Sequence, residues 1–210
     1  MEAHTGRTTT MTETPSTTPI AAPPLDVITR LLHLGLAVFG VWSWLDGLGW
    51  IGAGASDYDN PVYSGYIQHR WVGIVFTVFL LARILWGFVG PASVRFVNWV
   101  PWTPARLKVV VDDVRSLLRL RVPEHPAHVG LSGFVEALGL LAFLWLGLSG
   151  LLSAFTITPG IPVFGWLHVV KHWHQIGNVL VPAYLILHVG GTVAHSIVGK
   201  QVWKKMLFLK

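Results

Sequence analysis

Residues 167–198 read LHVVKHWHQIGNVLVPAYLILHVGGTVAHSIV, and this stretch decides the fold. Lys171 is its only Lys, Arg, Asp or Glu. The stretch is longer than the about 20 apolar residues that a helix needs to cross the hydrocarbon core of a membrane, so it predicts a membrane-spanning helix. Histidine is costly inside such a helix and is therefore a candidate for function. The stretch contains His168, His172, His174, His188 and His195.

Three further apolar stretches, at about residues 27–45, 67–89 and 131–155, are long enough to span a membrane. Of the 210 residues, 52% are hydrophobic and 12% are charged, against roughly 25% charged in a soluble domain. The mean hydropathy is +0.57. These values exclude a soluble globular domain and a mostly disordered chain. The sequence predicts an all-α membrane protein in which residues 25–210 form one four-helix transmembrane bundle.

The segments between these stretches predict the orientation. Basic residues gather in segment 91–130 and at the C-terminal end, whereas segment 46–66 carries aspartates and no basic residue. Basic loops stay in the cytoplasm, so we expect both termini on the cytoplasmic side of the membrane. Residues 1–24 predict a disordered cytoplasmic tail, without a signal peptide. An amphipathic helix is expected at about 104–120, on the inner membrane surface. The net charge of +5 reflects this topology and does not indicate nucleic-acid binding.

Two histidines of the last span share one face. His174 and His188 are fourteen residues apart, which places them within about 40° of each other on a helix and about 21 Å apart along its axis. His172 points about 160° away from His188. We therefore interpret His172 and His168 as polar groups at the outer interface. His195 is interpreted as a solvated helix end, with a contact to a haem propionate or a quinone as the alternative.

Two further histidines lie at matching depths. His33, near the cytoplasmic start of the first span, belongs with His188, and His69, at the outer start of the second span, belongs with His174. Two pairs of imidazoles on facing helices are what two bis-histidine haems require. The chain has no cysteine, which excludes thiolate zinc sites, covalently attached haem and iron–sulfur clusters bound by this chain alone.

Other residues inside the spans suit such cofactors. Arg83 lies on nearly the same face as His69 but at the depth of the inner haem, where a haem propionate would pair with it; snorkelling to the inner interface is the alternative. Glu136 is a candidate for handling a proton linked to quinone chemistry. Glycines near the histidines, which are Gly35, Gly73 and Gly177, suit either a flat cofactor or close helix packing.

Several motifs together resemble the bacterial cytochrome b561 and nickel–iron hydrogenase b-type cytochrome family. They are Arg30-Leu-Leu-His33, His69-x-x-x-Gly73, Arg83-Ile-Leu-Trp86-Gly87-Phe-Val-Gly-Pro91, Arg95-Phe96, His174-x-x-x-Asn178 and Leu187-His188-Val189. The similarity covers about residues 25–200. It implies four helices that hold two b-type haems between the four matching histidines and pass electrons between a quinone pool and a partner.

Three functions compete on this basis. The first is a respiratory electron carrier of the inner membrane that exchanges electrons between quinone and a redox partner, which would be a dehydrogenase or hydrogenase subunit or a soluble cytochrome. The second is a stand-alone quinone reductase that uses a small outer substrate such as superoxide. The third is a transporter or channel whose histidines carry protons, and this function predicts a protein without visible absorption.

Overall fold

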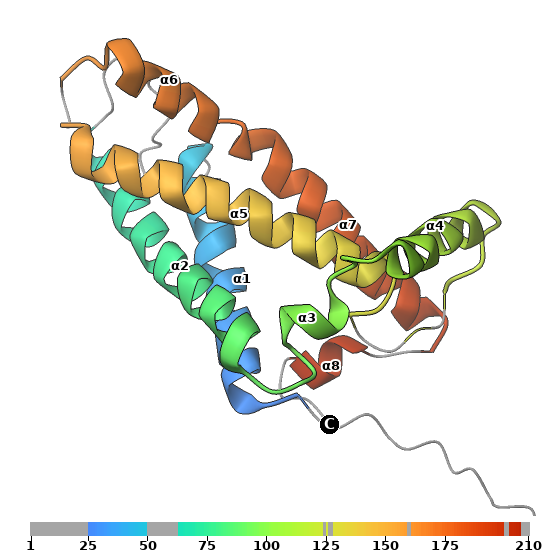
Figure 1. Ribbon diagram of the computed structural model, residues 1–210. Helices are drawn as coiled ribbons and strands as arrows, with labels where there is room; N and C mark the ends of the chain where they lie inside the picture. Colours follow the sequence, from blue (N-terminus) through green and yellow to red (C-terminus); the bar gives the residue numbers. More distant parts are fainter. Residues whose placement is uncertain are drawn as a thin grey trace, which may run out of the picture.

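The structure, a computed structural model, describes residues 25–49, 63–123, 125, 128–158, 161–199 and 202–206. Every regular element in these ranges is a helix (Figure 1). The helices are α1 (Val27–Gly47), α2 (Tyr63–Val89), α3 (Phe96–Trp99), α4 (Pro104–Leu118), α5 (Leu131–Thr156), α6 (Gly165–His174), α7 (Gly177–Ile197) and α8 (Val202–Met206). The predicted tail, residues 1–24, lies outside the described residues, as does segment 50–62 of the expected outer connection.

Four segments of the described chain are long and apolar enough to cross a membrane. They are α1, residues 65–89 of α2, α5, and α6 together with α7. The predicted all-helical class with four candidate spans is therefore confirmed. Helix α1 packs mainly against α2, while α5 packs against α2 on one side and against α6 and α7 on the other (Figure 1). This arrangement brings α1, α2, α6 and α7, which carry the candidate histidines, around one interior.

The start of α1 is fixed by a capping residue. The carboxylate of Asp26 accepts hydrogen bonds from the main-chain N–H of Thr29 (2.9 Å) and from its hydroxyl (2.7 Å). Burial raises the pKa of Asp26, but these hydrogen bonds outweigh burial and hold the pKa below its usual value. The indole N–H of Trp86 in α2 donates to the hydroxyl of Thr29 (3.0 Å). This contact joins the beginning of α1 to the end of α2.

The last predicted span is not one continuous helix. The sequence predicts a helix over 167–198 with a kink at Pro182, but the structure has two helices that are interrupted at Gln175 and Ile176. Here the main-chain N–H of Asn178 bonds to the carbonyl of Gln175 (2.9 Å), three residues back instead of four. This tighter turn contains Gly177, a poor helix former, whereas Pro182 is accommodated inside α7.

The segment between α2 and α5 contains the helix expected at about 104–120, and α4 ends at Leu118. The buried side chain of Asp113 in α4 caps the start of α5. One oxygen of this carboxylate accepts from the main-chain N–H of Leu131 (2.8 Å), and the other bonds to Nε2 of His125 (2.8 Å). Gly130, the residue before α5, supplies no side-chain cap. The location of α4 on the inner membrane surface stays a prediction.

Candidate functional site

The four histidines singled out by spacing form two pairs. The rings of His33 (α1) and His188 (α7) have centroids 6.1 Å apart and an interplanar angle of 42°. The rings of His69 (α2) and His174 (α6) have centroids 6.0 Å apart and an angle of 74°. In each pair the two rings come from different helices and face each other across the interior. We call the first pair the inner pair and the second the outer pair, after their expected depths.

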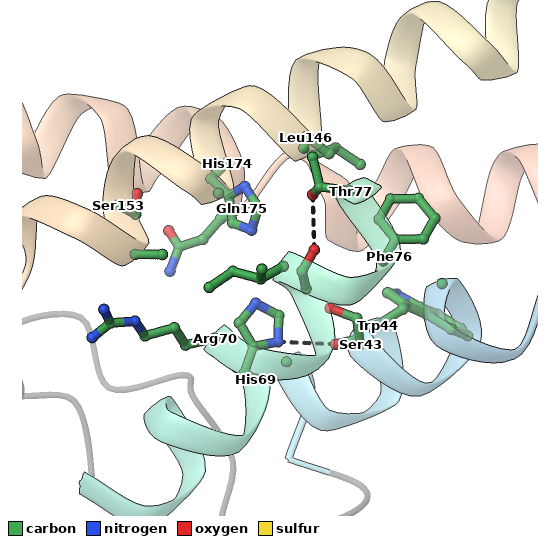
Figure 2. Close-up of a pocket in the computed structure, with 18 of the residues that line it drawn as sticks. Ser43, Trp44, His69, Arg70, Phe76, Thr77, Leu146, Ser153, His174 and Gln175 are labelled. Atoms are coloured by element: carbon green, nitrogen blue, oxygen red, sulfur yellow. Dashed lines mark hydrogen bonds between the residues drawn. The ribbon is translucent and has the colours of Figure 1, made fainter. Parts of the chain in front are cut away.

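Hydrogen bonds fix both rings of the outer pair. Nδ1 of His69 lies 3.0 Å from the main-chain carbonyl of Ser43 (Figure 2), which can only accept, so Nδ1 carries the proton. Nδ1 of His174 lies 3.0 Å from the hydroxyl of Ser149. That hydroxyl donates to the carbonyl of Trp145 (2.8 Å) and therefore accepts from His174. In both rings Nε2 is left with its lone pair, which is the state of an imidazole that ligates a metal.

A cavity lies between the two rings of the outer pair (Figure 2). Two of its glycines support the rings. A Cβ at Gly47 would lie 3.1 Å from Cε1 of His69, and a Cβ at Gly150 would lie 3.0 Å from Cε1 of His174. Any side chain at either position would push the ring, so the absence of Cβ sets the ring positions. Six glycines line this cavity: Gly40, Gly47, Gly73, Gly147, Gly150 and Gly177.

The three glycines noted in the sequence have different surroundings. Gly73 lines the cavity, and its nearest neighbour is the hydroxyl of Ser43. Gly35 packs against the ring of Phe79, so its lack of a side chain allows the close contact between α1 and α2. Gly177 lines the cavity and packs against Leu146.

The inner pair has different neighbours. The ring of Tyr184 stacks on His188, with centroids 5.2 Å apart and an angle of 12°. Nδ1 of His33 is buried and has no hydrogen-bond partner in the part of the chain that the structure describes. Arg83 is only 8% exposed and its guanidinium lies 5.7 Å from the ring centroid of Phe96. Its Nη1 also has no partner among the described residues. A buried cation in this state has room for an anionic partner.

Glu136 is bound to a histidine that the sequence analysis did not select. Its Oε2 lies 2.7 Å from Nδ1 of His128, in the turn before α5. Burial lowers the pKa of His128, but the hydrogen bond and the charge of Glu136 raise it by more, so the net pKa is above the usual value. The charge of Arg83 lowers the pKa of His128, which places the three groups within reach of one another's fields.

The remaining histidines of the last span stay outside these pairs. His172 is exposed and His168 is half-buried, and neither has a ring contact with the paired histidines. Nδ1 of His195 is buried without a hydrogen-bond partner in the described chain. Among the described residues, no group of three or more His, Cys, Asp or Glu is placed to hold a bare metal ion.

Sequence reasoning missed the residues that hold the histidines. The main-chain carbonyl of Ser43 leaves no mark in a sequence, because every residue has one. Ser149 and Gly150, two adjacent small residues in a mostly apolar span, were the available signal on α5. His128 was visible in segment 91–130, but its contact with Glu136 depends on the turn at 128–130, where φ is positive at His128 and Gly130.

The family model described as prokaryotic cytochrome b561 matches residues 25–208, nearly the whole chain. The chain belongs to the prokaryotic cytochrome b561 family. It is 25% identical over 164 residues to a probable Ni/Fe-hydrogenase B-type cytochrome subunit of Bradyrhizobium diazoefficiens, covering 70% of this chain and 66% of the relative. It is 29% identical over 153 residues to a probable Ni/Fe-hydrogenase 1 B-type cytochrome subunit of Escherichia coli K12, covering 60% and 62%.

The matches thus span less than two thirds of the length of either relative. No solved structure matches the chain significantly. With the family match, the four apolar helices identify the chain as a multi-pass membrane protein. The resemblance described from the motifs is confirmed, and the family description implies b-type haem as the cofactor.

The outer pair fits such a cofactor. An imidazole nitrogen binds a metal at about 2 Å, so two rings on opposite sides of one metal have centroids about 6 Å apart. Both pairs have this separation. Two imidazoles fill two coordination positions, which is the number that a porphyrin leaves open on its iron. A slot lined by glycines between the rings of the outer pair suits a flat macrocycle.

Proposed function

We propose that this chain binds two b-type haems, one between His33 and His188 and one between His69 and His174, and carries electrons across the membrane between them. The observation that carries the proposal is the pairing of four imidazoles from facing helices at ligand distance. When bound, each haem supplies a centre that accepts and releases one electron at a time. The protein supplies the positions, the surroundings and hence the potentials of the two centres.

The residues that contact the paired histidines or lie near them have separate roles in this proposal. Ser43 and Ser149 orient the rings of the outer pair so that Nε2 faces the cavity. Tyr184 holds the ring of His188 by stacking. Arg83, buried and with no partner for its Nη1 among the described residues, pairs with a propionate of the inner haem. The apolar helices around the sites exclude water, so that electrons pass between the centres without side reactions.

The same proposal includes a quinone near the inner side. Glu136 on α5 and His128 in the turn before it form a hydrogen-bonded pair that lies within reach of the charge of Arg83. Glu136 would receive or supply the proton that accompanies quinone reduction or oxidation. His128 would pass that proton toward the cytoplasmic surface.

For location and partner, we propose a bacterial inner-membrane protein with both termini in the cytoplasm and a catalytic redox subunit as its partner. The names of the two relatives favour a nickel–iron hydrogenase subunit over a dehydrogenase subunit or a soluble cytochrome. Affinity purification from native membranes tests this choice, because a hydrogenase subunit would co-purify. Turnover of quinone by the isolated chain with superoxide and no other polypeptide would favour the stand-alone reductase instead.

Purified protein in sealed vesicles tests electron transfer directly. With ferricyanide trapped inside and a membrane-impermeant reductant outside, the wild type should reduce the trapped oxidant. His33→Ala and His69→Ala should each slow this reaction to the rate of empty vesicles, because each interrupts the path at one depth. His172→Ala, an exposed histidine of α6, is the control and should keep the wild-type rate. Wild-type rates in both ligand variants would contradict the proposal.

A further inference from the structure

The cavity of the outer pair has one polar end. Arg70, Ser153 and Gln175 lie together on one side of the two rings (Figure 2), and Lys171 lines the same cavity. Nε of Arg70, the hydroxyl of Ser153 and Oε1 of Gln175 are buried and have no hydrogen-bond partner among the described residues. Buried polar atoms without partners cost free energy, so their concentration at one end indicates a place where a polar ligand group belongs.

The opposite end of this cavity is apolar. Phe76 and Leu146 lie on the other side of the rings from Arg70 (Figure 2). Phe143 and Val181 line the cavity as well. The cavity is therefore amphipathic along its length, with a cation and amide or hydroxyl groups at one end and hydrocarbon at the other.

Arg70 forms no ion pair with a carboxylate of the described residues. Its guanidinium carbon lies 5.9 Å from the ring centroid of Trp71 and 6.0 Å from that of Phe155, so it lies beside two aromatic rings. The acidic residue at the outer end of α1, Asp46, is fully buried, and neither of its carboxylate oxygens has a hydrogen-bond partner in the part of the chain that the structure describes. Arg70 and Asp46 are therefore not paired. An arginine beside a cavity prefers a carboxylate, which it can bind through two N–H groups.

We propose that the outer haem lies with its propionate edge toward Arg70 and Lys171 and with its apolar edge toward Phe76 and Leu146. This inference rests on the proposed function and specifies how the outer site holds its cofactor. A b-type haem is an apolar disc with two carboxylates on one edge, so its two ends match the two ends of the cavity. Arg70 and Lys171 are positioning residues here, because they act on the propionates and not on the iron.

The test compares haem b with haem dimethyl ester, whose propionates carry no charge, in the full-length His33→Ala protein, where only the outer site loads. Arg70→Gln should weaken the binding of haem b by roughly tenfold or more, since a hydrogen bond between charged groups is lost. It should leave the binding of the dimethyl ester unchanged. Arg119→Gln, which removes an exposed arginine from the end of α4, should change neither affinity.

Lys171→Gln provides a second variant with the same expected difference, and Arg70→Lys should restore part of the lost affinity. In the two-haem protein, Arg70→Gln should also lower the midpoint potential of the outer haem alone, because a positive charge near it is removed. An equal loss of affinity for both haems would overturn the orientation and leave the proposed function intact. Such an equal loss would be expected if Arg70 bound a small anionic substrate or stabilised the fold. Absence of any haem from the His69–His174 site would overturn both proposals.

Discussion

The hydroxyl of Ser149 is the acceptor that orients His174, and its effect is measurable as a redox potential. A hydrogen bond from Nδ1–H makes the imidazole a stronger electron donor to the metal. Ser149→Ala removes the acceptor, so the midpoint potential of the outer haem should rise while that of the inner haem stays unchanged. A redox titration followed by the haem absorption measures both potentials.

Ser196→Ala is the matched control for this substitution. Like Ser149, Ser196 donates its hydroxyl proton to a helix carbonyl, that of Thr192 at 2.9 Å, but it forms no hydrogen bond with a histidine of the described chain. Its removal should leave both potentials as in the wild type. A shift of the inner haem in Ser149→Ala, or equal shifts in both serine variants, would contradict the role assigned to Ser149.

His128 predicts a pH dependence of stability. Its folded-state pKa lies above the usual value of 6.5, because the hydrogen bond and charge of Glu136 outweigh burial. The stabilisation from this pair is therefore complete below pH 6.5 and is lost as the pH rises through the folded-state pKa. Wild-type protein should lose more thermal stability above that pH than His128→Asn, in which the residue still tolerates the φ of 66°. Parallel pH profiles of Tm would contradict this assignment.

At the scale of helices, Asp113 and its neighbour Asp112 provide a matched pair. Asp113 is buried and caps α5 through Leu131, whereas Asp112 is exposed and forms a surface ion pair with Arg115 at 3.1 Å. Asp113→Ala should lower the free energy of unfolding by about 1–2 kcal/mol, the typical cost of a lost helix cap. Asp112→Ala should cost under about 0.5 kcal/mol, as exposed pairs do.

Unfolding in detergent measures both variants, and equal losses would show that Asp113 is not the cap of α5. The same comparison can be made by limited proteolysis between α4 and α5. Because Asp113 also holds His125, cleavage in segment 119–130 should be faster in Asp113→Ala than in Asp112→Ala. Equal cleavage rates would contradict the tie between the two helices.

At the scale of the whole chain, the orientation is a separate prediction. A reporter enzyme that is active only in the cytoplasm should be active when fused after Lys210, because the basic segments 91–130 and 200–210 favour the inner side. A reporter that requires the periplasm should be active when inserted in segment 50–62. Opposite activities would show that the chain has the reverse orientation. The two histidine pairs would then exchange depths, and the pairing itself would be unchanged.

The sequence predicted the features that depend on chain length and spacing. Four apolar stretches predicted four candidate spans, because a helix in lipid must be long and apolar along its whole length. Helical spacing selected His174 and His188 over His172, and the structure brings the selected rings to their partners on α1 and α2. The interruption at Gln175 and Ile176 preserves this result, because both residues keep right-handed helical dihedrals.

Features that depend on contacts between distant segments could not be predicted in this way. The main-chain N–H of Leu131 donates a hydrogen bond to Asp113 and so joins α5 to α4. In the sequence, Asp113 has the surroundings of a residue in an ordinary surface helix. The support of His174 by Gly150 requires the angle at which α5 crosses α6. The polar end of the outer cavity likewise appears only when Arg70 of α2, Ser153 of α5 and Gln175 between α6 and α7 are brought together.

Haem content per polypeptide tests the central claim, two haems between two histidine pairs, most directly. The wild type should contain two low-spin haems by electron paramagnetic resonance. The double variant His33→Ala with His188→Ala should lose the same single low-spin haem as either single variant, because both residues serve one site. The double variant His33→Ala with His69→Ala should retain none. Retention of a low-spin haem in this second variant, or loss of both in the first, would contradict the account.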